Sequence, residues 1–595
     1  MKFIVVLINK IKKYSSVIIS MAGIVLLLVY NSIFNTWGYL TNDDISIQAT
    51  LSGLYLGKPF PVHQFVHFFL GYFISGLYRI CPVVQWWFFY SVALQCIGIF
   101  LITFSMFELT KRKGINYIYT IILIGVLYMS LFIYPTGYIS FTTVPVLLSG
   151  GLLSYLLMHI LIDDEQILVN NNLRLYIMSL IILAICIFHR SESGLSFIPY
   201  LLLMWLCYYL RIRTVKNKSF FRFVVQAFTF VLLSAIICIS NDVYSSSFNG
   251  NEFVEFNTAR AAYIDYPHDY YEENPDLFEK AGWSKELSKI VWYFADERVT
   301  TESFRIIADN SIHHRGSSTV RNWSGHFTTL LGRTQDRCWM LVHVILLAVT
   351  ITLFLNYKNT PFYYAFYLIS VNAGTLILFL FLMTKGRLIT RAVFCIAVPL
   401  LVSEIIVLLL KLDKVKIGPV TILVFFLIAL SLVTPLLNTI RVDDRYKEQS
   451  HLEARDIYNY VINNDDYIFV AFPGEIADQT IGDIYLQKKP TNLIDSGGSC
   501  FHSKYNKECA KINGMDSEFR TEMLKEGRFH MIFKDIYKPG CFILFYQYLA
   551  NDYNAIGFDF KRFGDNLYDV WYVFDGQSYS GNCYTVKNDT IIKIQ

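Results

Sequence analysis

Residues 15–44 read SSVIISMAGIVLLLVYNSIFNTWGYLTNDD, an apolar run that is followed closely by two adjacent carboxylates. A helix of about 20 apolar residues crosses the hydrocarbon core of a bilayer. Lysines between positions 10 and 13 precede the run, and no clear small-x-small cleavage motif follows it. We therefore expect a retained first membrane helix rather than a signal peptide, with Asp43 and Asp44 just beyond its end.

The composition of all 595 residues agrees with a membrane protein. Apolar residues make up 54% of the chain and charged residues 16%, whereas soluble domains carry about 25% charged residues. These values exclude an ordinary soluble enzyme, a disordered protein and a coiled coil. The near balance of 51 basic and 47 acidic residues excludes a generally basic nucleic-acid-binding protein.

Other apolar runs also have the length of a span, and the chain is expected to contain about eleven membrane helices. They lie near residues 15–36, 85–107, 115–134, 141–162, 174–189, 194–210, 221–240, 338–355, 361–383, 388–410 and 417–437.

Basic clusters orient these spans. Residues 111–113, 211–222 and 411–416 carry Lys and Arg in alternate loops, on the same side as the N-terminal lysines. Loops rich in Lys and Arg stay in the cytoplasm. The N-terminus is therefore expected inside and the C-terminus outside.

The predicted fold class is an α-helical polytopic membrane protein with a C-terminal extracytoplasmic α/β domain. We expect the membrane domain over residues 1–440 and the α/β domain over residues 441–595. The α/β prediction rests on helix and strand signals that alternate along the second range, including a helix at 516–526.

Two long segments of the membrane domain are expected on the outer side. Residues 37–84 read as two amphipathic interfacial helices, near 43–56 and 62–80. Residues 241–337 form a large polar loop, which is too long to lack structure of its own, with short helices such as 284–296.

Asp43 and Asp44 are the candidate catalytic residues. Ionisable side chains at the hydrocarbon edge are costly and often functional. A partly buried carboxylate next to a second one tends to have a raised pKa, which suits a general base. An alternative explains the same residues by local structure: Asn42 or Asp43 caps the following helix, and Asp44 adds favourable charge to its first turn.

Cations in two outer turns run against the orientation rule and are candidate phosphate ligands. Lys385, Arg387 and Arg391 lie at the start of a span, where Arg387 and Arg391 are one helical turn apart. Arg190 lies in another outer turn, close to Glu192. Guanidinium groups bind phosphate well. The alternatives are snorkelling to lipid headgroups and an Arg190–Glu192 ion pair that closes the turn.

Four further residues are candidates for substrate binding. His63 and His67 are spaced i, i+4 and would share a helix face, and Arg260 and Asp265 lie in the large outer loop. The histidine spacing would allow a metal, but the metalloprotease pattern of a paired carboxylate is missing. We therefore expect hydrogen bonding to a sugar or phosphate, or an interfacial role, more than metal binding.

Four cysteines fall in the C-terminal segment, where disulfides can persist. They are Cys500, Cys509, Cys541 and Cys583. Two disulfides are plausible, and Cys500–Cys509 is the nearest pair in sequence; the pairing stays open.

The arrangement resembles the GT-C superfamily of membrane glycosyltransferases, which includes protein O-mannosyltransferases and aminoarabinose transferases. The resemblance rests on a basic start, one span, Asn42-Asp43-Asp44 in an outer loop, a late outer Lys385-Gly386-Arg387 motif and a C-terminal outer domain. It implies a polyprenyl-phosphate-linked sugar as donor, an acid of the first outer loop as base and basic residues on the lipid phosphate. The chain has no acid at 135–140, where an outer turn is expected, so a divalent metal is left open.

The sequence therefore predicts an integral membrane glycosyltransferase of a bacterial cell membrane. It would move a sugar, with inversion, from a polyprenyl phosphate to a cell-envelope glycan or glycolipid on the outer face. Its partners would be these two substrates and membrane lipids, and not nucleic acid. A polysaccharide polymerase or ligase, a lipid-linked glycan transporter and a non-catalytic scaffold remain alternatives.

Overall fold

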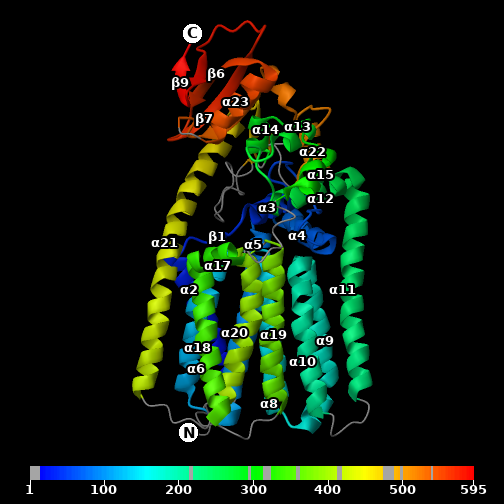
Figure 1. Cartoon of the computed structure of the whole chain (residues 1–595), viewed down its shortest axis with the longest axis vertical. Coiled ribbons are helices and arrows are strands. Elements are labelled where there is room, and N and C mark those ends of the chain that lie inside the picture. Colours follow the sequence, from blue (N-terminus) through cyan, green and yellow to red (C-terminus); the bar gives the residue numbers. More distant parts are fainter. Residues whose placement is uncertain are drawn as a thin grey trace. The chain divides into compact units, whose positions relative to one another are not determined.

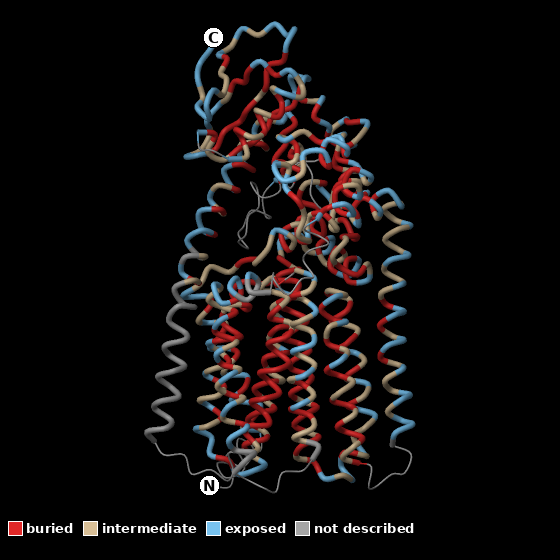
Figure 2. Tube along the Cα trace, viewed as in Figure 1, coloured by how far each residue is buried: buried red, intermediate tan, exposed pale blue. Residues whose placement is uncertain are grey.

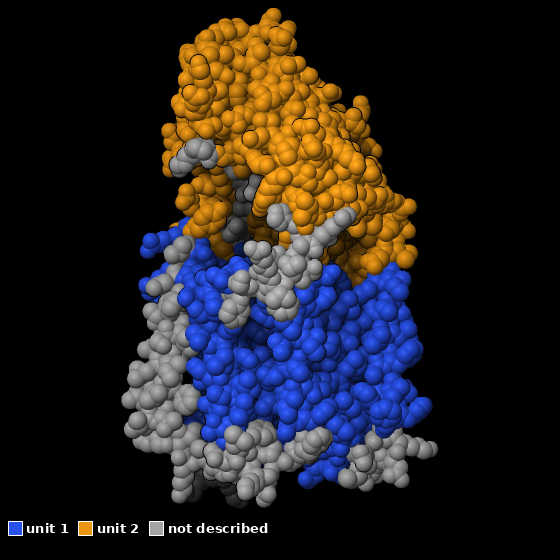
Figure 3. All heavy atoms as spheres, viewed as in Figure 1, with its two compact units in different colours: residues 1–40, 88–240, 320–445 blue, residues 41–87, 241–319, 446–595 orange. Residues whose placement is uncertain are grey.

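The structure is a computed structural model of the chain. It describes residues 14–212, 219–291, 296–312, 323–356, 362–386, 388–411, 419–472, 488–495, 500–537 and 540–595. The chain divides into two compact units, each built from three sequence segments (Figure 3). Unit 1 contains Met1–Leu40, Phe88–Ser240 and Val320–Arg445, and unit 2 contains Thr41–Trp87, Asn241–Thr319 and Tyr446–Gln595.

Ten helices of the described residues are long and apolar enough to cross a membrane, which confirms the expected spans up to residue 410 (Figure 1). They are α2 (Ser15–Phe34), α5 (Trp86–Lys113), α6 to α7 (Tyr117–Gly137), α8 (Thr143–Ile162), α9 (Glu165–His189), α10 (Ser191–Ile212), α11 (Ser219–Asn249), α18 (Thr334–Asn356), α19 (Phe362–Thr384) and α20 (Thr390–Lys411). The eleventh expected span falls in α21 (Pro419–Asn463), whose side chains up to residue 438 lie outside the described residues.

Helices α8 and α20 form the centre of unit 1. Each buries 83% of its apolar window, and Figure 2 shows both as mostly buried. Helix α8 crosses α5 closely, because a Cβ added at Gly151 would meet the Gly98 carbonyl oxygen at 2.6 Å. Small residues at such crossings let membrane helices approach, and any larger side chain would force α5 and α8 apart.

The chain between α7 and α8 is held by backbone hydrogen bonds. Strand β1 (Gly38–Tyr39) pairs in parallel with β2 (Tyr138–Ile139). The Tyr138 hydroxyl donates a 2.9 Å hydrogen bond to the Ile440 carbonyl. A π-helical turn, η1 (Tyr128–Phe132), precedes this segment, and the Trp339 indole donates to its Ser130 carbonyl at 2.7 Å. These bonds fix the position of Phe141, which is fully buried just after β2.

Unit 2 begins with the first expected outer segment. Its helices are α3 (Asn42–Ser52) and α4 (Phe68–Ile80). The expectation of an amphipathic surface helix at 43–56 was wrong, because every residue of α3 from Asp44 to Ser52 except Ser46 is buried and the helix ends at Gly53. Gly53 has φ 69°, and a Cβ there would lie 1.9 Å from the Lys58 carbonyl oxygen, so the chain can turn back only at glycine.

The large outer loop folds into short helices, as expected. They are α12 (Asn251–Ile264), α13 (Pro275–Lys280), α14 (Lys285–Ile290) and α15 (Thr301–Asn310). Aromatic side chains join them: the Tyr263 ring lies edge-on to Trp283 at 5.4 Å, and Phe304 lies edge-on to Trp283 at 5.3 Å.

The C-terminal segment forms a mixed seven-stranded sheet in the order β4-β3-β5-β7-β6-β8-β9. The strands are β3 (Ile468–Ala471), β4 (Leu493–Asp495), β5 (Phe529–Lys534), β6 (Ala555–Arg562), β7 (Leu567–Phe574), β8 (Tyr584–Lys587) and β9 (Thr590–Lys593). Helices α22 (Lys504–Ile512) and α23 (Cys541–Tyr553) complete the α/β fold, which confirms the predicted class. The helix expected at 516–526 is wrong; only a 3-10 turn, η6 (Thr521–Lys525), forms there. No disulfide joins the described cysteines.

Each face of this sheet is packed by a helix. On one face, α23 contributes Phe542 and Phe545 to a cluster with Phe533 of β5. On the other face, the end of α21 contributes Ile457 and Val461. This second cluster also contains Ala49 of α3 and Leu54, so the first outer segment is part of the core of unit 2.

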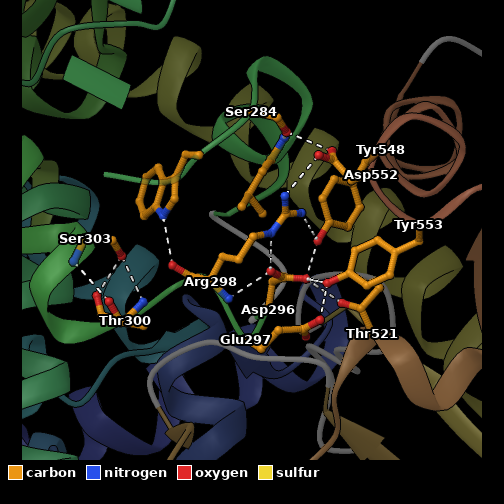
Figure 4. Close-up of polar contacts among 12 residues, drawn as sticks. Ser284, Asp296, Glu297, Arg298, Thr300, Ser303, Thr521, Tyr548, Asp552 and Tyr553 are labelled. Atoms are coloured by element: carbon orange, nitrogen blue, oxygen red, sulfur yellow. Dashed lines mark hydrogen bonds and ion pairs between the residues drawn. The ribbon is translucent and has the colours of Figure 1, made fainter. Parts of the chain in front are cut away.

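A buried carboxylate in the large loop, that of Asp296, joins this loop to the C-terminal segment (Figure 4). Asp296 is fully buried and accepts hydrogen bonds from Thr521 at 2.7 Å, from Tyr553 at 2.8 Å and from Tyr548. The Arg298 guanidinium donates to the same carboxylate at 3.0 Å. Although desolvation opposes it, the hydrogen bonds from Tyr548 and Thr521, the Arg298 backbone and Tyr553 lower the pKa of Asp296.

Replacing Asp296 by Asn is expected to destabilise unit 2 by about 3–5 kcal/mol, because Arg298 loses its buried partner. A carboxyl whose pKa is lowered by folding stabilises the protein above its unfolded pKa, about 3.9, and this contribution is lost as pH falls further. The difference between wild type and Asp296→Asn should therefore shrink below about pH 4. Tryptophan fluorescence during thermal unfolding of the full chain measures it. The exposed Asp276→Asn is the control, and an equal loss there would contradict the assignment.

Candidate functional site

Helix α3 begins at the N-cap Thr41, and its first turn carries both candidate acids. The Thr41 hydroxyl donates a 2.7 Å hydrogen bond to the carboxylate of Asp44, which is fully buried. The alternative that Asn42 or Asp43 caps the helix was therefore wrong, because Thr41 is the N-cap. Both acids do lie at the positive end of the helix dipole, as that alternative expected for Asp44. Asp44 holds the helix start, whereas the half-buried Asp43 is better placed to meet a substrate.

Arg260 lies within electrostatic reach of Asp43. The charges that act on its guanidinium group are those of Asp265, Asp43 and Cys500, all in unit 2. Burial lowers the pKa of Arg260, and these neighbours oppose that shift. Its Nε donates a 3.2 Å hydrogen bond to Asn257 on the preceding turn of α12. Arg260 is thus within electrostatic range of Asp43 and Asp265, although the sequence places Asp43 and Arg260 in two separate segments.

His63 contacts Ser46 of α3, the helix that also carries Asp43. Its Nε2 lies 3.2 Å from the Ser46 hydroxyl and 3.9 Å from the Cys500 sulfur. Its Nδ1 accepts a 3.3 Å hydrogen bond from the Phe65 backbone N–H. Burial lowers the pKa of His63 to about 3, so the imidazole is neutral at physiological pH.

The prediction that His63 and His67 share a helix face was wrong. Helix α4 begins at Phe68, and residues before it are not helical. The residues from His63 to Val66 instead form a turn, in which the Val66 N–H donates a 3.2 Å hydrogen bond to the His63 carbonyl. His67 is instead the N-cap of α4, and its Nδ1 accepts from the Phe69 N–H at 3.2 Å.

A second cluster lies in unit 1, where two of the predicted phosphate ligands meet at one ring. The Arg190 guanidinium carbon lies 4.1 Å from the centroid of Phe141, and that of Arg391 lies 5.9 Å from it. Arg190 follows α9, Phe141 precedes α8 and Arg391 is in the first turn of α20, so three spans present these residues at one end of unit 1. Both groups are cationic, and guanidinium groups bind anions such as phosphate through charge-assisted hydrogen bonds.

The expected Arg190–Glu192 ion pair also forms, with Nε and the carboxylate 3.3 Å apart. Glu192 is 72% exposed, so solvent screens this pair and it contributes little to stability. Lys385 is exposed at the end of α19, and Arg387 lies outside the described residues.

Arg333 holds the turn between α19 and α20. Its guanidinium donates to the Leu388 carbonyl and lies 3.4 Å from the fully buried carboxylate of Asp336. Thr390 donates to the same carboxylate at 3.4 Å. These contacts fix the start of α20, and with it Arg391.

Sequence reasoning missed three kinds of residue. Ser46 and Cys500 gave no local signal, because only the fold brings them to His63. Glu404 of α20 is fully buried inside a predicted span, and His343 of α18 lies 3.0 Å from its carboxylate. An acid within an apolar run was visible in the sequence, but Glu404 was not among the candidate residues.

Metal ligands are not gathered anywhere in the described part of the chain: no group of three His, Cys, Asp or Glu side chains there could hold a metal ion.

Two solved structures are similar to this chain over nearly its whole length. One is ArnT from Cupriavidus metallidurans bound to undecaprenyl phosphate, with 12% identity, 94% of this chain and 98% of that chain covered, and a TM-score of 0.37. The other is the same protein in the apo state, with 13% identity, 93% and 97% coverage and a TM-score of 0.37. ArnT is a GT-C glycosyltransferase. No protein-family model and no curated protein matches the sequence. At this identity and TM-score, function is argued from the residues alone.

The His63 ring is expected to keep one tautomer, with its proton on Nε2, from pH 5 to pH 8. Nδ1 is occupied as an acceptor, and burial keeps the pKa near 3. Nitrogen-15 NMR of histidine-labelled protein, with His63→Gln used to assign the signal, measures this. A ring that titrates near pH 6.5 would contradict the assignment.

Proposed function

We propose that the chain is an integral membrane glycosyltransferase that takes a sugar from a polyprenyl phosphate carrier. The observation that carries the proposal is the meeting of Arg190 and Arg391 at Phe141, at the ends of three apolar spans. A phosphate attached to a membrane lipid lies at this depth and carries the charge that two arginines neutralise.

The acceptor site is the cluster of Asp43, Arg260 and Asp265. Asp43 takes the proton of an acceptor hydroxyl as its oxygen attacks the anomeric carbon of the donor sugar. The bond from that carbon to the phosphate oxygen breaks, and the leaving polyprenyl phosphate keeps the electron pair. Attack opposite to the leaving group inverts the anomeric centre. Asp44 keeps its structural role at the helix start.

Arg190 and Arg391 stabilise the negative charge that grows on the phosphate as the bond breaks. Lys385, at the end of α19, is proposed to attract the phosphate, and the same role is proposed for Arg387 from the sequence. Glu192 and His67 are proposed to bind sugar hydroxyls, whereas both ring nitrogens of His63 are engaged with Ser46 and Phe65. A divalent metal is not required by these roles, and whether one takes part is left to experiment.

Localisation follows from the basic loops. With Lys111, Arg112 and Lys113 inside, the ends of α9 and α20 that carry Arg190 and Arg391 face outward. We place the protein in a bacterial cell membrane, with the N-terminus in the cytoplasm and the C-terminal domain outside. The acceptor is then a glycan or glycolipid of the cell envelope.

A transporter is the second candidate, because the His343–Glu404 pair lies within the spans. Transporters place ionisable residues along a path through the membrane. One ion pair between α18 and α20 also has a simpler explanation, since it joins two neighbouring helices. We therefore prefer the transferase.

Asp43→Asn is expected to lower sugar transfer by about 100-fold or more, which is the usual contribution of a general base. The assay follows label from the donor in a lipid extract into envelope glycan purified from cells that lack this chain. Asp44→Asn should mainly lower the unfolding temperature, and the exposed Asp276→Asn should change neither. Undiminished transfer in both Asp43→Asn and Asp44→Asn would refute the base.

Arg391→Gln and Arg190→Gln are expected to raise the apparent KM for the lipid donor by roughly 10- to 100-fold, the value of one charge-assisted hydrogen bond. The acceptor KM should stay near its wild-type value. Arg305→Gln, which removes an exposed ion pair with Glu255, is the matched control. An unchanged donor KM in both variants would remove the phosphate role.

A further inference from the structure

Ser46 shares a face of α3 with the proposed base. It follows Asp43 by three residues, and residues three apart on a helix lie side by side, about 5–6 Å apart at Cβ. Its hydroxyl makes two contacts among the described residues: 3.2 Å to His63 Nε2 and 3.5 Å to Cys500 Sγ. Neither contact is with another residue of α3, so the hydroxyl is held by side chains from other segments, His63 and Cys500.

The direction of the Ser46–His63 hydrogen bond can be worked out. His63 Nδ1 accepts from the Phe65 N–H and therefore carries no proton. The buried ring is neutral, so its single proton is on Nε2, which donates to the Ser46 oxygen. Ser46 uses a lone pair for His63 and keeps its own O–H to donate. The Cys500 sulfur at 3.5 Å is a weak acceptor and competes poorly for it.

The face of α3 thus offers two complementary groups one helical turn apart. The Asp43 carboxylate accepts a proton, and the Ser46 hydroxyl donates one. Arg260 is within electrostatic range of Asp43 and makes one hydrogen bond among the described residues, from Nε to Asn257, so its two Nη groups are further donors. A sugar with two neighbouring oxygens matches this pattern, because one hydroxyl gives its proton while the next oxygen accepts.

We propose that Ser46 binds the oxygen next to the reacting hydroxyl of the acceptor, and that His63 is a positioning residue that fixes the Ser46 hydroxyl as a donor. The proposal rests on the glycosyltransferase function given above and narrows its acceptor class. The acceptor sugar presents a vicinal pair of oxygens, and an analogue lacking the second oxygen is rejected because Ser46 is left without its partner.

The test uses the full chain and the same assay, with purified unmodified envelope glycan as the titrated acceptor. Ser46→Ala is expected to raise the acceptor KM about tenfold with kcat nearly unchanged, since the contact is present in ground and transition states alike. Ser46→Thr keeps the hydroxyl and should restore binding. His63→Ala should behave as Ser46→Ala does, whereas His63→Gln keeps an N–H donor near the Nε2 position and should remain close to wild type.

The double variant Ser46→Ala/His63→Ala separates a shared role from two independent ones. If His63 acts through Ser46, the double variant is no worse than Ser46→Ala alone. Additive losses would overturn the positioning role of His63. Equal losses in Ser46→Thr and Ser46→Ala would show that packing, and not the hydroxyl, matters, which overturns the proposal.

The outcomes also distinguish this proposal from the function on which it rests. If wild type transfers sugar, Asp43→Asn does not, and Ser46→Ala keeps the wild-type acceptor KM, the acceptor proposal alone is wrong. If wild type transfers no sugar in any preparation that unfolds cooperatively, the function and the proposal both fail.

Discussion

Burial of α3 is the constraint on which unit 2 depends. A helix in which every residue from Asp44 to Ser52 except Ser46 is buried cannot leave its polar side chains without partners. The Thr41 hydroxyl donates to the Asp44 carboxylate at the start of the helix, and Gln48 donates to Gln85 in its middle. Lys489 donates at 2.6 Å to the Ser52 carbonyl, where its positive charge also meets the negative end of the helix dipole.

The same burial gives the candidate site its rigidity. Ala49 and Leu54 pack against strands β3 and β4 of the C-terminal sheet through Phe469 and Leu493. Asp43 and Ser46 therefore stand on an element that the core of unit 2 holds in place, and not on a mobile loop. A base and a hydroxyl held in this way need little ordering when a substrate binds, which is the main gain of a preorganised site.

The sequence predicted the membrane part almost completely, because the thickness of hydrocarbon sets the length of a span. Helix α9, for example, was expected at 174–189 and runs from Glu165 to His189. The candidate residues were predicted from charge placement alone, which identified Asp43, Arg190 and Arg391. Their partners could not be found in this way. Phe141 and Ser46 carry no charge, and their meeting with the candidates depends on contacts between distant parts of the chain.

Two local predictions failed, each for its own reason. The segment at 43–56 was expected to be an amphipathic surface helix, but an amphipathic pattern does not tell a surface from a core. In α3 the polar side chains are buried with hydrogen-bond partners, and Gly53 ends the helix earlier than Gly57 would. In the segment at 62–80, a turn closed by a hydrogen bond from the Val66 N–H to the His63 carbonyl comes first, and the helix begins at Phe68.

A pair of ionisable residues, Glu404 and His343, lies inside the membrane spans, where charged residues are scarce. Glu404 is fully buried, and His343, which is 27% exposed, lies 3.0 Å away on the neighbouring helix. Whether the proton is on the imidazole or on the carboxyl, the pair as a whole is neutral, and gaining or losing a proton would leave a net charge in hydrocarbon. The pair therefore holds α18 against α20 without offering a charge to a passing substrate. The charges that can act on a substrate are then those at the ends of the spans and in unit 2, where Arg190, Arg391 and Asp43 lie.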